Sequence, residues 1–258
     1  MKEISITEFE NLSIGQAENT DAGTGCTVLL FGKQGAPAGL DVRGGGPASR
    51  ESELLKPLAA ADAIHAILLS GGSAYGLDAA GGVMRYLEEH DIGFDVGVAK
   101  VPLVCQSCLF DLAVADTHIR PNADMAYTAC KNAETGNYRD GNFGAGTGAT
   151  VGKLLGVEHC MKSGIGSYAI QTGELKIGAL VAVNALGDVC DWKNGQIVSG
   201  LLADDGKTFL DSELVSAQKI DIVENKFTGN TTLGVILTNA AFQKSQLCKI
   251  AGMAHDGY

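Results

Sequence analysis

The stretch that decides the fold is Phe227-Thr-Gly-Asn-Thr-Thr-Leu-Gly-Val-Ile-Leu-Thr-Asn-Ala240. Residues 233–237 form an aliphatic, partly β-branched run, which is the composition of a buried strand. A polar Gly-Asn turn stands directly before the two threonines that lead into it. The pattern therefore predicts that Thr231 begins a strand, with a flexible turn immediately behind it.

A threonine at this position suits one unusual chemistry. Its hydroxyl can attack the carbonyl of the preceding residue, and hydrolysis of the resulting ester then splits the chain at Asn230–Thr231. The freed α-amino group has a reference pKa of roughly 7.7–8 and can serve as base for its own hydroxyl. Two ordinary readings compete: a structural turn before a strand, and an N-glycosylation acceptor at Asn230-Thr-Thr232, which matters only in a secreted protein.

Composition limits the class of protein. The chain has 258 residues, of which 19% are charged and 45% hydrophobic, and its 35 glycines predict closely approaching backbones. A net charge of −11 argues against nucleic acid or an anionic membrane surface as partner. We find no signal-peptide pattern and no apolar run near 18 residues, so we expect a cytoplasmic protein. The seven scattered cysteines, odd in number, fit reduced thiols.

The order of apolar runs predicts layered α+β architecture with a mixed sheet and one domain over 1–258. Ser70-Gly-Gly-Ser73 is expected to open a helix from Ala74 to about Glu89, with Ser73 as N-cap. The polar residues 204–228 are expected to form a surface loop. Further helices are predicted at 122–132 and 242–255, and strands at 25–32, 40–43, 63–69, 166–171 and 175–184.

Several motifs fail in context. Gly144-x-Gly146-x-x-Ala149 follows a polar loop instead of a strand, which excludes a dinucleotide fingerprint. Leu154 stands where a phosphate loop needs Ser or Thr after Gly152-Lys153. Cys105-x-x-Cys108 has no second pair at zinc spacing. We therefore expect neither a metal nor a cofactor.

Several stretches together resemble one family, the DmpA-type peptidases (peptidase family S58). These have L-aminopeptidase/D-esterase and β-peptidyl aminopeptidase activities and include 6-aminohexanoate-oligomer endohydrolases. The stretches run in order along the chain: Asp41-Val-Arg-Gly-Gly-Gly-Pro-Ala-Ser-Arg-Glu51, Leu69-Ser-Gly-Gly-Ser-Ala-Tyr-Gly-Leu-Asp-Ala-Ala80, Leu109-Phe-Asp-Leu112, Gly144-Ala-Gly-Thr-Gly-Ala-Thr-Val-Gly-Lys153, Val181-Ala-Val-Asn184, Gly229-Asn-Thr-Thr232 and Thr238-Asn239.

The resemblance implies a DmpA/ArgJ-like α/β/β/α layered fold, related to N-terminal-nucleophile hydrolases, that cleaves itself before its nucleophile. By motif, Thr231 is the expected nucleophile, Asn184 an oxyanion donor, and Lys153 a group that either stabilises the deprotonated oxygen of Thr231 or assists proton transfer. The loop Ser70, Gly71, Gly72, Ser73 is a candidate part of the substrate site.

Two departures from the family pattern bear on activity. Some relatives have a tyrosine at the position of Phe110, whose ring cannot donate a hydrogen bond. The family also continues beyond residue 258 into a segment with an acidic pair. The resemblance thus implies a missing C-terminal segment, division into 1–230 and 231–258 if the chain is processed, and slow or absent self-cleavage of this chain.

We therefore expect a self-processing amide hydrolase, most simply an aminopeptidase and a homo-oligomer, acting on short peptides or peptide-like amides. The alternatives are an acyltransferase of the ornithine acetyltransferase type and an inactive fragment. Short L-peptides, D-amino-acid amides, β-peptides and nylon oligomers all fit as substrates.

Overall fold

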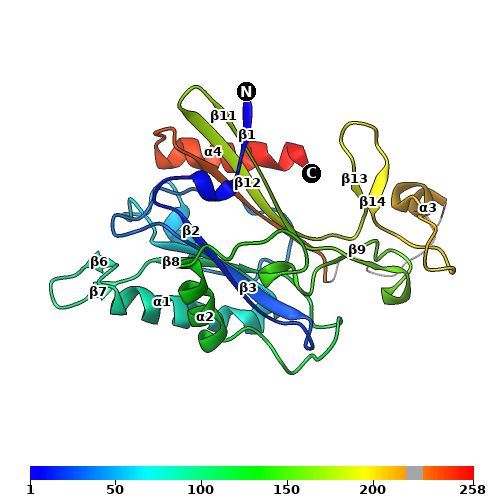
Figure 1. The fold of residues 1–258 in the computed structure, drawn as a ribbon, viewed down its shortest axis with the longest axis horizontal. Coiled ribbons are helices and arrows are strands. Elements are labelled where there is room, and N and C mark those ends of the chain that lie inside the picture. The colour runs from blue at the N-terminus through cyan, green and yellow to red at the C-terminus, as the bar shows by residue number, and fades with distance from the viewer. Residues whose placement is uncertain (219–228) are drawn as a thin grey trace.

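Two β-sheets face each other across an apolar core, and helices cover the far side of the first sheet (Figure 1). The computed structural model describes residues 1–218 and 229–258. The first sheet has the order β2-β3-β5-β8-β4, and the second the order β1-β11-β12-β15. In the first sheet β5 and β8 run parallel while the other neighbours run antiparallel, so the expected α+β class with a mixed sheet is confirmed.

The strands of the first sheet are β2 (Ser13–Asn19), β3 (Thr24–Leu30), β4 (Ser49–Arg50), β5 (Ala66–Ser70) and β8 (Val104–Cys108). β3 is buried along its whole length because both of its faces are covered. Leu29 lies in the core between the sheets, whereas Val28 and Leu30 pack with the helices. This alternation is the two-residue period of a strand.

The helical layer consists of α1 (Ala80–Glu89) and α2 (Ala123–Ala133). The predicted start of α2 is confirmed, because the Asn122 side chain caps the helix by accepting from the Met125 amide. The predicted start of α1 is wrong. A 3-10 helix, η3 (Ser73–Ala79), precedes α1, and Ser73 is its first residue with a left-handed φ of 52° instead of an N-cap.

The second sheet is antiparallel throughout and contains β1 (Lys2–Ile4), β11 (Ile165–Thr172), β12 (Leu175–Asn184) and β15 (Thr231–Thr238). Leu180 and Ala182 of β12 and Val235 of β15 are buried in the core between the sheets. The predicted bounds of β12 and the predicted start of β15 are both confirmed.

Helix α4 (Lys244–Ala254) follows β15 and lies against the segment after β3. The ammonium group of Lys244 donates to the carbonyls of Leu54 and Ala59, and the Arg43 guanidinium donates to the Gly252 carbonyl. These contacts join the end of the chain to residues about 190 positions earlier in the sequence.

Two expectations for irregular regions are wrong. Residues 40–43 form no strand, and part of the expected loop 204–228 is a helix, α3 (Ser212–Gln218). Residues 219–228 of that prediction lie outside the described part of the chain. The remaining strands are short pairs: β6 (Phe94–Asp95) with β7 (Lys100–Val101), β9 (Thr150–Val151) with β10 (Met161–Lys162), and β13 (Val189–Cys190) with β14 (Ile197–Ser199).

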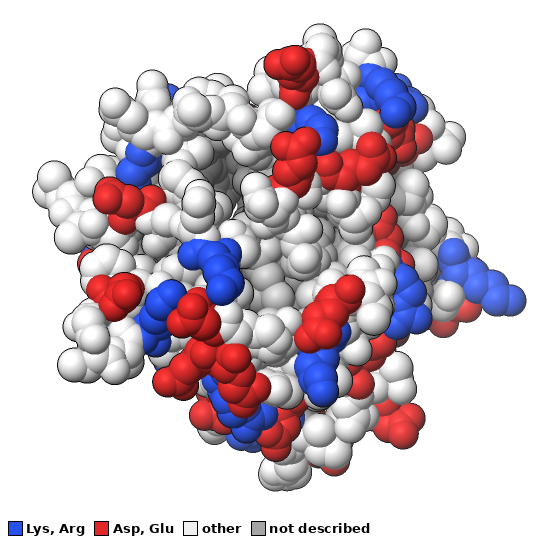
Figure 2. Space-filling view, turned by 60° about the vertical axis from the view of Figure 1, so that its left-hand side comes forward, with Lys and Arg blue, Asp and Glu red and all other residues white. Residues whose placement is uncertain are grey.

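The surface carries charges of both signs. On the face shown in Figure 2, acidic and basic side chains are interspersed around a hollow lined by uncharged residues. Within the ranges 1–218 and 229–258, none of the helices has the length and apolar character needed to cross a bilayer.

Candidate active site

The end of one strand and the start of another bring Asn184 and Thr231 together. Asn184 is the last residue of β12 and Thr231 the first of β15, and the two are direct partners in the register of the sheet. Side chains alternate along a strand, so Asn184 shares the inner face with buried Leu180 and Ala182. Thr231 shares it with Val235 in the same way. Both side chains therefore face the space between the sheets.

Every polar atom of the Asn184 amide has a partner. The side chain is fully buried. Its Oδ1 accepts from the Thr150 amide at 3.1 Å and from Lys153 Nζ at 2.7 Å. Its Nδ2 donates to the Phe110 carbonyl at 2.8 Å and to the Gly229 carbonyl at 3.1 Å. Because burying an unsatisfied polar group is costly, this network fixes the amide in one orientation.

Lys153 approaches the Asn184 side chain from the turn that follows β9. Gly152 lets the chain turn there, since its φ is +68° and a Cβ would lie 2.1 Å from the Leu201 amide nitrogen. The Lys153 ammonium donates to the backbone carbonyl of Asn184 at 3.0 Å and to that of Gly229 at 3.2 Å. Burial disfavours its charged form and lowers the pKa of Lys153 to about 8. The amine is therefore poised to exchange a proton near neutral pH.

The turn before Thr231 is held by these two side chains. The Gly229 carbonyl accepts from both Lys153 and Asn184. Gly229 has φ +85°, and the Phe110 ring lies 3.1 Å from where its Cβ would be, so a larger residue would be strained and crowded. The structure thus brings the three predicted site residues to one place. Their catalytic roles stay predictions.

Asp111 is a further residue of this region, and sequence reasoning assigned no role to it. It is 4% exposed, accepts from the Thr24 hydroxyl at 2.6 Å and from the Gly72 amide at 2.7 Å, and follows Phe110 directly. Burial raises the pKa of Asp111, while those two hydrogen bonds and the nearby Lys162 ammonium act in the opposite direction. Asp111 thereby anchors the chain beside the Phe110 carbonyl that Asn184 contacts.

The candidate loop Ser70 to Ser73 contacts Asp111 through the Gly72 amide. Ser70 is fully buried. Its hydroxyl accepts from the side-chain amide Nε2 of Gln106 at 3.0 Å and lies 3.1 Å from Cys108 Sγ. The Ser73 amide donates to the Leu109 carbonyl. The loop therefore supports the Phe110–Asp111 segment, and its direct contact with substrate remains a prediction.

The arrangement places a hydroxyl, an amine of lowered pKa and a fixed amide donor on neighbouring elements, with the Asn184 amide buried and Thr231 and Lys153 half-buried. These are the parts needed for attack on a carbonyl, proton transfer and stabilisation of an oxyanion. Within residues 1–218 and 229–258, no group of three or more His, Cys, Asp or Glu side chains could hold a metal ion.

The model of peptidase family S58 matches residues 5–258. The chain belongs to peptidase family S58. The stretches that carried the resemblance are thus those of a true member, and members of this family are hydrolases of amide bonds.

Curated relatives of this S58 peptidase agree with the family model. An uncharacterized aminopeptidase of Mycobacterium leprae is 36% identical over 98% of this chain and 72% of its own length. A 6-aminohexanoate-oligomer endohydrolase of a Kocuria species is 28% identical, over 96% of this chain and 67% of its own length.

Solved structures support the fold. The L-aminopeptidase D-Ala-esterase/amidase of Ochrobactrum anthropi, a variant of the Ntn-hydrolase fold, superposes with a TM-score of 0.69 at 16% identity, covering 98% of this chain and 68% of that one. A β-aminopeptidase from a Burkholderia species gives 0.65 at 22% identity, covering 98% and 66%. The S58 chain therefore has the Ntn-hydrolase fold.

Proposed function

We propose that this S58 peptidase is an aminopeptidase or amidase whose nucleophile is the Thr231 hydroxyl, freed as an N-terminal residue by cleavage of Asn230–Thr231. One observation carries the proposal. Lys153 and Asn184 converge on the turn immediately before Thr231, and Asn184 is the strand partner of Thr231. Its family membership and relatives named as aminopeptidases support the class of reaction.

Processing requires one intramolecular step and one hydrolysis. The Thr231 oxygen attacks the carbonyl carbon of Asn230, the C–N bond breaks, and the acyl group becomes an ester while the nitrogen gains a proton. Water then hydrolyses the ester, which leaves a carboxylate on Asn230 and a free α-amine on Thr231. Lys153, with its pKa lowered to about 8 by burial, can take up and return the proton of the hydroxyl.

Hydrolysis of a substrate uses the same oxygen. The Thr231 hydroxyl attacks the substrate carbonyl as its proton passes to the α-amine or to Lys153. The amide of Asn184 donates to the negative oxygen that forms, and a preorganised buried donor is most effective there. The leaving amine takes the proton, and water hydrolyses the remaining ester.

In the uncut chain the Gly229 carbonyl occupies both donors. Lys153 Nζ and Asn184 Nδ2 bind it at 3.2 and 3.1 Å, one peptide before the bond to be cut. For cleavage, these two donors have to exchange the Gly229 carbonyl for the Asn230 carbonyl as their acceptor. For catalysis, they have to bind the carbonyl oxygen of the substrate instead. We therefore expect slow scission, and activity that grows with the cleaved fraction.

The test follows the intact mass of the purified chain during incubation, together with hydrolysis of an alanine p-nitroanilide. Products with the masses of residues 1–230 and 231–258 should accumulate as activity rises. Thr231→Ala should abolish scission and lower kcat/KM by at least about 10³-fold, since one hydroxyl serves both steps. Thr231→Ser should retain part of each.

The matched control is Thr232→Ala. Thr232 is the next residue of β15 and faces the opposite side of the sheet, so this variant should still be cut and active. Cleavage at Asn230–Thr231 in Thr231→Ala, or undiminished hydrolysis by that variant, would show that the nucleophile is elsewhere.

The acetyltransferase alternative is not favoured, because the relatives reported above are a peptidase and an amide hydrolase. Assay of acetyl transfer to glutamate tests it directly. The single domain over 1–258, the cytoplasmic location and the homo-oligomeric state stay predictions.

A further inference from the structure

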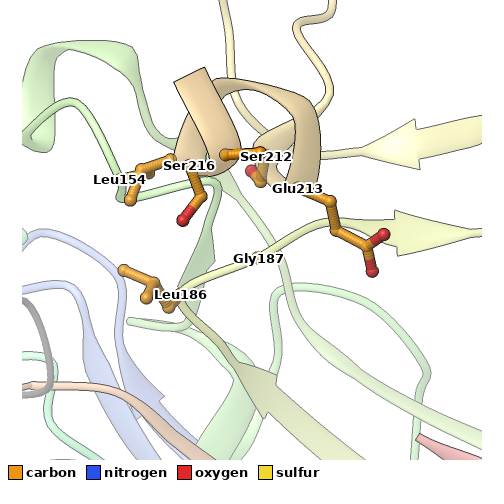
Figure 3. Close-up of a pocket in the computed structure, with 7 residues that line it drawn as sticks. Leu154, Leu186, Gly187, Ser212, Glu213 and Ser216 are labelled. Carbon is orange, nitrogen blue, oxygen red and sulfur yellow. The ribbon is translucent and has the colours of Figure 1, made fainter. Parts of the chain in front are cut away.

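A cavity of about 470 Å³ is lined in part by Leu154 and Leu186, which are near neighbours in the chain of Lys153 and Asn184 (Figure 3). Its volume is in the range of small-molecule sites, roughly 300–1,000 Å³. The lining surface is mostly apolar and comes from three segments: Leu154, Leu186, Gly187, Ser212, Glu213, Ser216 and Ala217. Figure 3 shows Leu154, Leu186 and Ser216 grouped on one side, while the carboxylate of Glu213 extends away from both leucines.

Backbone hydrogen bonds connect one wall of the cavity, formed by Leu154, Leu186 and Gly187, to the segment that carries Lys153. The Lys153 amide donates to the Leu186 carbonyl at 2.9 Å, and the Gly152 amide donates to the Gly187 carbonyl at 2.9 Å. Leu154 follows Lys153 directly. Leu186 is two residues after Asn184, which an extended chain spans in about 7 Å. A molecule whose carbonyl met the Asn184 amide could therefore place a short side chain in the cavity.

The opposite wall is held in place by Asp188. Its carboxylate accepts from the Ser212 amide and hydroxyl, both at 2.8 Å, and from the Leu201 amide at 2.8 Å. These bonds fix the start of α3 against the loop that follows β12. The cavity is therefore a built feature with two tethered walls.

We propose that this cavity binds the side chain of the substrate residue that provides the carbonyl, and that it selects aliphatic side chains. The inference rests on the proposed aminopeptidase function and adds the class of residue accepted. Each buried methylene favours binding, whereas a charged side chain would be desolvated against Leu154 and Leu186.

The first experiment compares leucine and alanine p-nitroanilides. The leucine substrate should have a kcat/KM about tenfold or more above the alanine substrate, since a missing methylene in an apolar pocket costs roughly 10–200-fold. Equal values for the two substrates would overturn the proposal.

The second experiment fills the cavity. A Cβ at Gly187 meets no atom within 4 Å, so Gly187→Val should fold and project into the space. It should reduce the leucine-to-alanine ratio several-fold. Gly166→Val is the matched control, because Gly166 on β11 is also open and does not line the cavity. If Gly187→Val does not fold, Ser216→Leu tests the same ratio, because Ser216 lines the cavity from α3 and is itself solvent-exposed. An unchanged ratio in the folded variant would refute the assignment.

Binding separates this proposal from the proposed function. If neither anilide is hydrolysed, the proposed function fails, and saturation-transfer NMR with leucinamide and alaninamide then tests the cavity alone. Stronger transfer to leucinamide in the wild type, reduced in Gly187→Val, supports the cavity as a binding site. Equal transfer to both amides would overturn it.

Discussion

The two ends of the β12–β15 pair are each closed by an asparagine and a lysine, yet their surroundings differ. At one end the exposed Asn239 accepts from the Lys176 amide at 2.8 Å and donates to the Glu174 carbonyl at 2.7 Å. At the other end Asn184 is fully buried and contacts Lys153. The asparagine thus meets only the backbone amide of Lys176 at the exposed end, whereas at the buried end it meets the side-chain ammonium of Lys153. It is the burial of Asn184 and Lys153, and not the strand pairing, that makes the second end suitable for catalysis.

Of the substitutions that compare the two ends of this strand pair, removal of the buried Asn184 amide should have the largest effect. Asn184→Ala takes away the donor to the Gly229 carbonyl and leaves the buried Thr150 amide without its acceptor. We expect kcat/KM for an alanine anilide to fall roughly 10²–10³-fold, the effect of losing one oxyanion donor. Steady-state kinetics on protein shown to be folded by circular dichroism measures this. A loss below about threefold would remove Asn184 from the mechanism.

A smaller effect should distinguish the two lysines by pH. Because burial lowers the pKa of Lys153 to about 8, its neutral form grows as pH rises through 8, and kcat/KM should increase roughly tenfold per pH unit below that value. Lys153→Arg, whose guanidinium stays charged, should lose this rise of kcat/KM with pH. Lys176→Arg at the far end of β12 should keep it. If kcat/KM still rises with pH in Lys153→Arg, the titrating group is the Thr231 amine instead.

The same shift has a consequence for stability. Between pH 8 and the ordinary lysine pKa of about 10.4, the Lys153 amine binds more protons in the unfolded chain than in the folded chain. The contribution of Lys153 to folding stability therefore rises with pH across that window.

The smallest effect should come from the exposed end. Asn239→Ala removes two hydrogen bonds at the surface, and we expect a loss of roughly 0.5–1.5 kcal/mol in the free energy of unfolding. Urea denaturation measures it, and kcat/KM of the folded protein should be unchanged. A large loss of activity would contradict the view that the two ends have different tasks.

Local patterns predicted the elements that build this pair, and long-range contacts decided the rest. The aliphatic runs placed β12 and the start of β15 correctly, because a strand's composition is a local property. Helix α3 was missed, since its start is held by Asp188, 24 residues earlier. Ser73 looks like a helix cap in sequence, but the Leu109 carbonyl binds its amide and the residue takes a left-handed conformation.

The candidate site shows the same division. Thr231, Lys153 and Asn184 could be predicted as neighbours in a site because each stands in a stretch that resembles the family. Asp111 lies in a different stretch of the family resemblance, residues 109–112, and its partners Thr24 and Gly72 are 87 and 39 residues away. No pattern in the sequence relates a buried carboxylate to partners at such separations, so its anchoring role needed the folded structure.

All eight residues of β15 are in register with β12, beginning at Thr231 itself. A break in the chain at Asn230–Thr231 would therefore remove one covalent bond while leaving the ladder that holds the C-terminal piece, and Lys244 would still join α4 to the carbonyls of residues 54–61. The two pieces would remain associated as the two chains of one non-covalent complex. They would elute together under native conditions, and an affinity tag on either piece would recover both.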